Sequence, residues 1–230
     1  MKVNFLVANF RKVVPNQTVF NLLKFYLPFF LILLVSGLQN AVPVHILTRD
    51  VFADKNTPPY TGLISNLGVL VLCCSAAVCL FTFFLLQPTT GQAKKTKNCL
   101  GYFGLISAWM MIDDFFMLHD EVMPLYLGIP EKLVILLTLT WVFFHVVYFR
   151  TIILKSTNFK LLGLAFLFLG FSLFIDILPG EIDYVGNESN LFFLLEDGSK
   201  LMGIATWCFY LFSTCSQQIL LSQRRYLSQH

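Results

Sequence analysis

Three aspartates interrupt long apolar stretches of this sequence, which makes them the first candidates for chemistry. Asp113 and Asp114 follow the uncharged run 98–112, and Asp176 follows the uncharged run 161–175. Fifteen residues of helix reach only roughly 22 Å, which is less than the ~30 Å of a hydrocarbon core. We therefore expect all three aspartates to lie inside a membrane, at a similar depth just below one surface. A tilted helix or a locally thin bilayer would instead place them in interfacial water.

Carboxylates at that depth are costly unless they are paired, hydrated or protonated. If Asp113, Asp114 and Asp176 converge with Glu196, and only Lys200 opposes them, they cannot all stay ionised. A bound cation, protons held at a raised pKa or a basic ligand must compensate. Oxygen ligands favour a hard divalent cation such as Ca²⁺, Mg²⁺ or Mn²⁺ over zinc. The three aspartates are therefore candidate catalytic groups, and together with Glu196 they are candidate metal ligands.

His119 stands close to the paired aspartates in the sequence, but helix geometry separates it from them. At about 100° per residue, the four acids of the run 113–121 share one face of a straight helix. His119 lies about 240° round from Asp113 on that helix. It can join Asp113 and Asp114 in one site only if the helix bends, and Pro124 is near enough to supply a bend. We expect His119 to lie outside the site.

Two further stretches carry polar and aromatic residues at helical spacing. In the run 196–217 such residues recur at alternating steps of four and three, and a second stripe joins Thr138, Trp141, His145 and Tyr148. Stripes of this kind face protein or water sooner than lipid. They predict either a binding surface or a seam between packed helices, and Glu196 and Lys200 also have the spacing of a local ion pair. The binding candidates are Asn66, His145, Glu196, Lys200, Trp207 and Tyr210.

These residues are positioned by six apolar stretches, each about long enough to cross a membrane as a helix. The runs are too long for the strands of a barrel. The sequence therefore predicts an all-α fold, a polytopic bundle of six transmembrane helices in one domain, 25–223. Residues 1–24 are expected to form a cytoplasmic or interfacial segment and 224–230 a cytoplasmic tail. The six expected spans are 25–46, 62–87, 98–117, 133–149, 161–180 and 201–223.

Charge predicts the orientation of the bundle. Most of the sixteen Lys and Arg residues fall before the first span, between the second and third, between the fourth and fifth, or in the tail. All thirteen Asp and Glu residues fall on the other side of an alternating topology. By the positive-inside rule both termini are cytoplasmic, and the acidic connections face outward. The protein is expected in the plasma (cell inner) membrane, as a multi-pass protein.

Composition excludes several classes of protein. With 57% hydrophobic residues and 25 Phe, the chain has too little polar surface for a soluble domain of 230 residues. Its net charge of +3 is spread over short flanks that suit lipid headgroups, so membrane lipids are the expected partners and nucleic acid is not. The six cysteines lie in or beside apolar spans, where cysteine behaves as a small hydrophobe.

Three classes of function remain open. The first is an enzyme at the outer leaflet, in which the aspartates hold a divalent cation or act as general acid and base on a lipid or lipid-linked substrate. The second is a proton- or cation-coupled transporter of small solutes, with His145 and the stripe 196–217 continuing the path inward. The third is a non-catalytic subunit or sensor that binds partner helices or forms a homo-oligomer, for which Gly163 and Gly170 offer a seam.

Overall fold

The computed structural model describes residues 2–39, 41–48, 60–88, 90–177 and 187–227, and every regular element in these ranges is helical. This agrees with the predicted all-α fold. In chain order the elements are α1 Lys2–Leu38, α2 Val44–Thr48, α3 Leu63–Leu85, α4 Gly91–Phe116, a π-helical turn Leu118–Val122, α5 Met123–Leu127, α6 Glu131–Tyr148, α7 Arg150–Ser156, α8 Phe159–Ile177 and α9 Asn187–Leu227.

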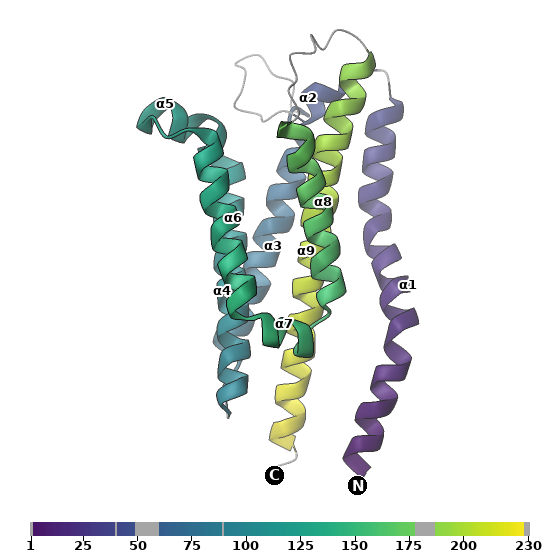
Figure 1. The fold of residues 1–230 in the computed structure, drawn as a ribbon. Helices are drawn as coiled ribbons and strands as arrows, with labels where there is room; N and C mark the ends of the chain where they lie inside the picture. Colours follow the sequence, from purple (N-terminus) through teal and green to yellow (C-terminus); the bar gives the residue numbers. More distant parts are fainter. Residues whose placement is uncertain (1, 40, 49–59, 89, 178–186, 228–230) are drawn as a thin grey trace.

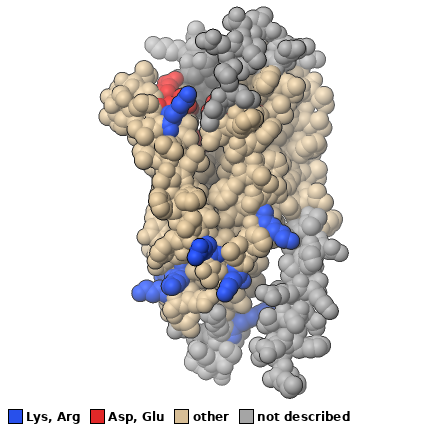
Figure 2. All heavy atoms as spheres, viewed as in Figure 1, with Lys and Arg blue, Asp and Glu red and all other residues tan. Residues whose placement is uncertain are grey.

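The long helices lie side by side and alternate in direction along the bundle (Figure 1). The short helices α2 and α5 lie at one end, which we call the α5 end, and α7 lies at the other, the α7 end. The start of α1 and the end of α9 are both at the α7 end. In the view of Figure 2, Lys and Arg side chains gather toward the α7 end, and Asp and Glu side chains lie at the α5 end. The charge asymmetry of the sequence is thus an asymmetry between the two ends of the bundle.

Five helical segments in the described part of the chain are long and apolar enough to cross a membrane, which agrees with the expectation of a multi-pass membrane protein. They are Phe20–Leu38, Leu63–Leu85, Gly91–Phe116, Glu131–Tyr148 and Phe159–Asp176. The expected sixth span, 201–223, lies within α9, which is not among the five. A sixth span and the direction of the bundle across the membrane therefore stay predictions.

The first span ends earlier than the expected boundary of residue 46. Helix α1 stops at Leu38 because the side chain of Gln39 bonds to the backbone that follows. The amide of Val42 donates to Gln39 Oε1 over 2.7 Å, and Gln39 Nε2 donates to the Ser36 carbonyl over 3.3 Å. A side chain that satisfies free backbone groups competes with continuation of the helix. The separate short helix α2 follows. The end expected for the fifth span, 178–180, lies outside the described residues.

Helix α9 is the centre of the bundle and packs most extensively against α8 and α3. Trp207 and Tyr210 of α9 are fully buried, and both meet the edge of the Phe103 ring, with ring centroids 5.3 and 5.7 Å apart. Gly203 allows α8 to approach closely, since a Cβ there would lie 2.7 Å from Leu169 Cγ. The middle of the polar stripe of α9, from Gly203 to Thr214, is therefore covered by protein, whereas Gln217 is exposed.

Helix α6 lies at the edge of the bundle, and Val134 and His145 are its only buried residues. It is tied to α4 by a hydrogen bond from Trp109 Nε1 to Thr138 Oγ1 over 2.9 Å. The ring of His145 adds an edge-on contact with Phe103, at a centroid distance of 4.3 Å. Thr138 and His145 of the expected stripe therefore contact α4, whereas Trp141 and Tyr148 are exposed.

Candidate metal centre

The site is created where α4 ends. Met117 adopts a left-handed backbone conformation, with φ 51° and ψ 44°, and it is the only non-glycine residue of the described chain with a positive φ. Its amide donates to the carbonyl of Asp113, which closes the helix. The next turn is π-helical, and the amides of Glu121 and Val122 both donate to the Met117 carbonyl, over 2.9 and 3.1 Å. This reversal directs the residues after Phe116 back toward the end of α4.

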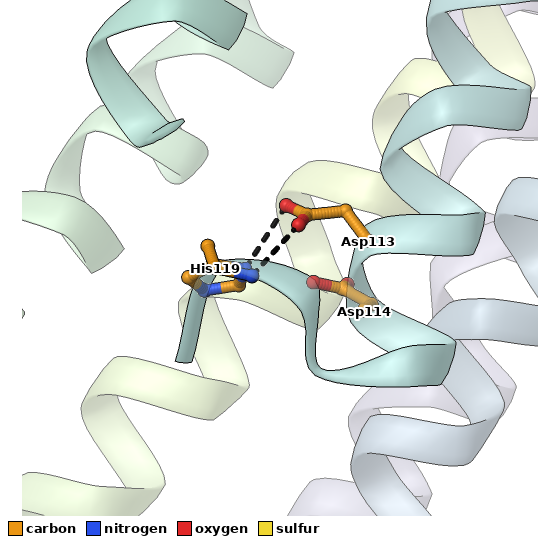
Figure 3. Close-up of side chains that lie close together, drawn as sticks. All are labelled: Asp113, Asp114 and His119. Carbon is orange, nitrogen blue, oxygen red and sulfur yellow. Dashed lines mark hydrogen bonds and ion pairs between the residues drawn. The ribbon is translucent and has the colours of Figure 1, made fainter. Parts of the chain in front are cut away.

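His119 is brought onto Asp113 by that turn (Figure 3). Its backbone amide donates to Asp113 Oδ1 over 3.1 Å, and its ring atom Nδ1 lies 3.0 Å from Asp113 Oδ2. Nδ1 is buried, and this contact with Asp113 is an ion pair when the ring is protonated. On the other side of the ring, Nε2 lies 3.3 Å from Asp120 Oδ1. The imidazole therefore stands between two carboxylates.

Asp114 has a different partner, from the centre of the bundle. Lys200 of α9 donates from Nζ to Asp114 Oδ1 over 3.0 Å. The carboxylate of Asp114 is 11% exposed, whereas the Lys200 side chain is 38% exposed. This ion pair connects the last turn of α4 to α9, and part of the Lys200 side chain remains exposed.

The three side chains together have the composition of a metal site. One possible ligand atom from each of Asp113, Asp114 and His119 can be chosen so that all three atoms lie within 4.8 Å of one another. Two carboxylate oxygens and one imidazole nitrogen suit a divalent cation that accepts mixed oxygen and nitrogen ligands. Three protein ligands with room for water or substrate are typical of catalytic rather than structural metal sites.

Acidic side chains dominate the electrostatics of the α5 end of the bundle. Burial would lower the pKa of His119, but the interaction with Asp113 and the charge of Asp120 outweigh it, and the net shift of the pKa is upward. Glu196 lies before the predicted span 201–223, and its pKa is raised to about 7. Burial is the main cause, followed by the charges of Asp197 and Asp176. His119 and Glu196 therefore hold a proton more tightly than they would as free side chains.

The predicted acidic site residues are brought together only in part. Asp113 and Asp114 meet as expected, and Lys200 contacts Asp114. Asp176 is exposed at the end of α8 and is not part of the group of three, although its charge acts on Glu196. Glu196 is half-buried and likewise outside the group. The expected meeting of three carboxylates is therefore a meeting of two carboxylates and an imidazole.

The remaining binding candidates lie elsewhere. His145 is buried against aromatic rings, with Nε2 4.0 Å from Cys99 Sγ. The indole of Trp207 donates to Ser107 Oγ over 2.9 Å, and the hydroxyl of Tyr210 lies 3.1 Å from Thr157 Oγ1. Asn66 is half-buried in the first turn of α3. These side chains make contacts inside the bundle and do not belong to the group around Asp113.

His119 is the site residue that sequence reasoning placed wrongly. The expectation assumed a straight helix through residue 119, whereas α4 ends at Phe116. A bend was considered at Pro124, but the reversal occurs at Met117, and Pro124 stands in the first turn of α5. The one signal in the sequence was the presence of a proline so soon after the acids, because proline marks the start of a new helix.

Comparisons with known proteins identify a family. No curated protein and no solved structure gives a significant match to the chain. One family model, described as "Domain of unknown function (DUF8692)", matches residues 26–214. The match covers Asp113, Asp114, His119 and Lys200, and with them most of the bundle. The chain therefore belongs to the family of that domain of unknown function.

Proposed function

We propose that this protein binds a divalent cation between Asp113, Asp114 and His119, and uses it to act on a lipid or lipid-linked substrate at the outer surface of the plasma membrane. The single observation that carries the proposal is the reversal at Met117. It collects ligand atoms of three residues within 4.8 Å of one another at the end of a membrane helix. A left-handed non-glycine residue beside such a group is the kind of backbone strain that clusters at functional sites.

The ligand set narrows the choice of cation. Carboxylate oxygens alone would favour Mg²⁺ or Ca²⁺, and an added imidazole nitrogen favours Mn²⁺ or Zn²⁺. In the neutral ring one nitrogen of His119 carries a lone pair, and Nδ1, which lies beside Asp113, could offer it as a ligand atom. We expect Mn²⁺ or Zn²⁺ to bind more tightly than Mg²⁺.

A lipid substrate fits the surroundings of the site. Helix α5 follows the π-helical turn directly and exposes Leu125, Tyr126 and Leu127 by 73, 80 and 62%. Apolar and aromatic side chains are enriched where a protein meets the membrane interface. The acids of this end face outward if the positive-inside rule holds. A substrate with a polar group at the interface and an apolar tail would therefore reach both the three ligands and α5.

The reaction expected of this site is hydrolysis or group transfer. A divalent cation held there would polarise a carbonyl or phosphoryl oxygen and lower the pKa of bound water. The residues of the chain orient the site, since Asp113 holds the backbone of His119 and Asp120 faces its Nε2. Asp120 is 48% exposed, so solvent reaches the carboxylate that faces the imidazole.

An enzyme explains the structure better than a transporter does. A solute crossing the bundle from the site would meet Phe103, Trp207 and Tyr210, all of which are buried in the middle of the core. Transporters commonly place their binding site near the midplane, between repeated halves. The candidate ligands lie instead at one end of the bundle, and the sequence has no visible repeat.

Metal content tests the proposal. We would purify the protein in detergent with Mn²⁺ or Zn²⁺ supplied, and measure bound metal by plasma mass spectrometry after gel filtration. Wild type is expected to hold about one ion per chain, and Asp113→Asn, Asp114→Asn and His119→Ala to lose it. Asp176→Asn is the matched control, because it removes an exposed carboxylate at the same end, and it should keep the metal. A wild type without metal, or equal loss in all four variants, would overturn the proposal.

A further inference from the structure

One cation already contacts the candidate ligands, and it belongs to the chain itself. The ammonium of Lys200 lies 3.0 Å from Asp114 Oδ1, and Asp114 is one of the three residues able to ligate a metal. While the amine of Lys200 is protonated it has no lone pair, so it cannot act as a metal ligand. An ammonium and a divalent cation cannot both stand against the same carboxylate oxygen without strong repulsion.

We propose that Lys200 is a tethered competitor for the metal, so that the site exchanges an internal ion pair for a bound divalent cation. This inference rests on the proposed function, because it assumes that Asp113, Asp114 and His119 bind the ion. In the metal-free state, which we call closed, the ammonium of Lys200 neutralises Asp114. In the metal-bound state, which we call open, the divalent cation binds the Asp114 carboxylate, and Lys200 turns away from it.

The displaced ammonium has alternative partners among the nearby acids. Glu196 lies one turn before Lys200 on α9, at a spacing that suits an ion pair. The charges of Asp197 and Asp120 already act on Lys200 in addition to that of Asp114. The Lys200 side chain is also 38% exposed, so its long stem has room to swing. Moving the ammonium from α4 to these acids therefore leaves no buried charge without a partner.

The exchange has a structural consequence for the bundle. The pair of Lys200 and Asp114 is a polar tie between α4 and α9 near the α5 end, whereas the bond from Trp207 to Ser107 ties the same helices further inside. Breaking only the outer tie would loosen the mouth of the site and leave the core intact. Metal binding would in this way be coupled to the opening of the site toward its substrate.

Titration of Mn²⁺ by calorimetry tests the proposal on the full-length protein in detergent. Lys200→Met removes the charge and keeps much of the stem, so it should bind Mn²⁺ at least about tenfold more tightly than wild type, within the range typical of coupling between two ligands. Lys200→Arg keeps the charge and should bind like wild type or more weakly. Lys132→Met, which removes an exposed lysine at the same end, is the matched control and should not change the affinity.

The outcomes separate this inference from the proposed function. If wild type and Lys200→Met bind Mn²⁺ equally well, Lys200 is no competitor and the inference fails, while the metal site stands. If neither wild type nor Lys200→Met binds Mn²⁺, both fail. The shift of the melting temperature caused by saturating Mn²⁺ is a second readout, which should be larger in Lys200→Met than in wild type because that variant leaves Asp114 unpaired without metal. An equal shift would also contradict the inference.

Discussion

Each aspartate at the end of α4 has its own basic partner. Asp113 is bonded by the backbone of His119 and faces its ring, and Asp114 is paired with Lys200. The compensation that buried carboxylates require is therefore supplied from within the chain. Removing one partner of such a pair lowers the folding stability by more than the pair itself adds to it, because the other charge stays buried without a partner. The arrangement makes Asp113 and Asp114 dependent on different helices.

The raised pKa of Glu196 predicts how stability depends on pH. The folded protein holds this carboxyl at a pKa of about 7, against a usual value of 4.5. Between these values the folded state binds more protons than the unfolded state, so stability must fall as the pH rises through this range. We expect wild type to melt at a higher temperature at pH 5 than at pH 8, relative to Glu196→Gln.

The measurement is thermal unfolding in detergent at pH 5 and pH 8, with Glu196→Gln and Asp176→Asn side by side. Glutamine does not titrate, so the variant should show a smaller loss of melting temperature across this range. Asp176→Asn removes one of the charges that raise the pKa of Glu196, and should reduce the loss in part. Parallel behaviour of wild type and Glu196→Gln would show that the Glu196 carboxyl is not perturbed.

At the scale of residues, the sequence drew attention to Asp113 and Asp114 but placed the histidine outside their group. Asp113 and Asp114 could be found because the number of uncharged residues before them predicts how deep in the membrane a helix would place them. Lys200 could be found because it lies on a regular stripe. His119 could not, since its position depends on the backbone angles of Met117, a residue with no special tendency toward a left-handed conformation.

At the scale of elements, the middles of the predicted spans agree with the structure better than their ends. Periodicity and hydropathy extend over many residues, so they identify a helix but not the residue at which it stops. Helix α1 ends where Gln39 bonds to Val42, and α4 ends at the turn of Met117. Both ends depend on individual side chains or backbone angles. The second of them creates the candidate site, which is why the fold was easier to predict than the site.

The packing of α8 against α9 depends on Gly203. A Cβ at this position would lie 2.7 Å from Leu169 Cγ and 3.0 Å from the backbone nitrogen of Leu169, so the helices would have to separate. We expect Gly203→Ala to destabilise the protein by about 1–3 kcal/mol, the usual cost of overpacking. The measurement is the free energy of unfolding in mixed micelles, together with the metal content of the variant.

Gly163 is the matched control for this change, because it lies on α8 and a Cβ there would meet nothing within 4 Å. Alanine favours a helix by about 1 kcal/mol over glycine, so Gly163→Ala should leave the protein as stable or more so. Gly170 is equally open, so within the described part of the chain no other element packs against a Cβ at either glycine of the expected seam. A loss of stability in Gly163→Ala would point to a partner chain against this face.

At the scale of the whole molecule, the outer helices expose apolar side chains, and polar side chains are concentrated in the interior of the bundle. The five candidate spans include segments that expose large side chains such as Phe84, Leu167 and Phe174, whereas the middle of α9 is buried against its neighbours. A central helix can carry Ser, Thr and Trp when neighbouring helices provide hydrogen-bond partners for their polar groups. Hydropathy alone therefore does not identify α9 as a membrane span, and the sixth span stays a prediction.

The orientation of the bundle decides which solution the candidate site meets, and cysteine labelling tests it. Glu121 is exposed beside the site, and Lys95 is exposed near the start of α4 at the other end of the bundle. By the positive-inside rule, Glu121→Cys should react with a membrane-impermeant maleimide in intact cells, and Lys95→Cys only after lysis. Both changes are made in a background in which the exposed Cys73 and Cys74 are alanine. The reverse pattern would place Asp113, Asp114 and His119 in the cytoplasm, and the substrate would then have to come from the inner leaflet.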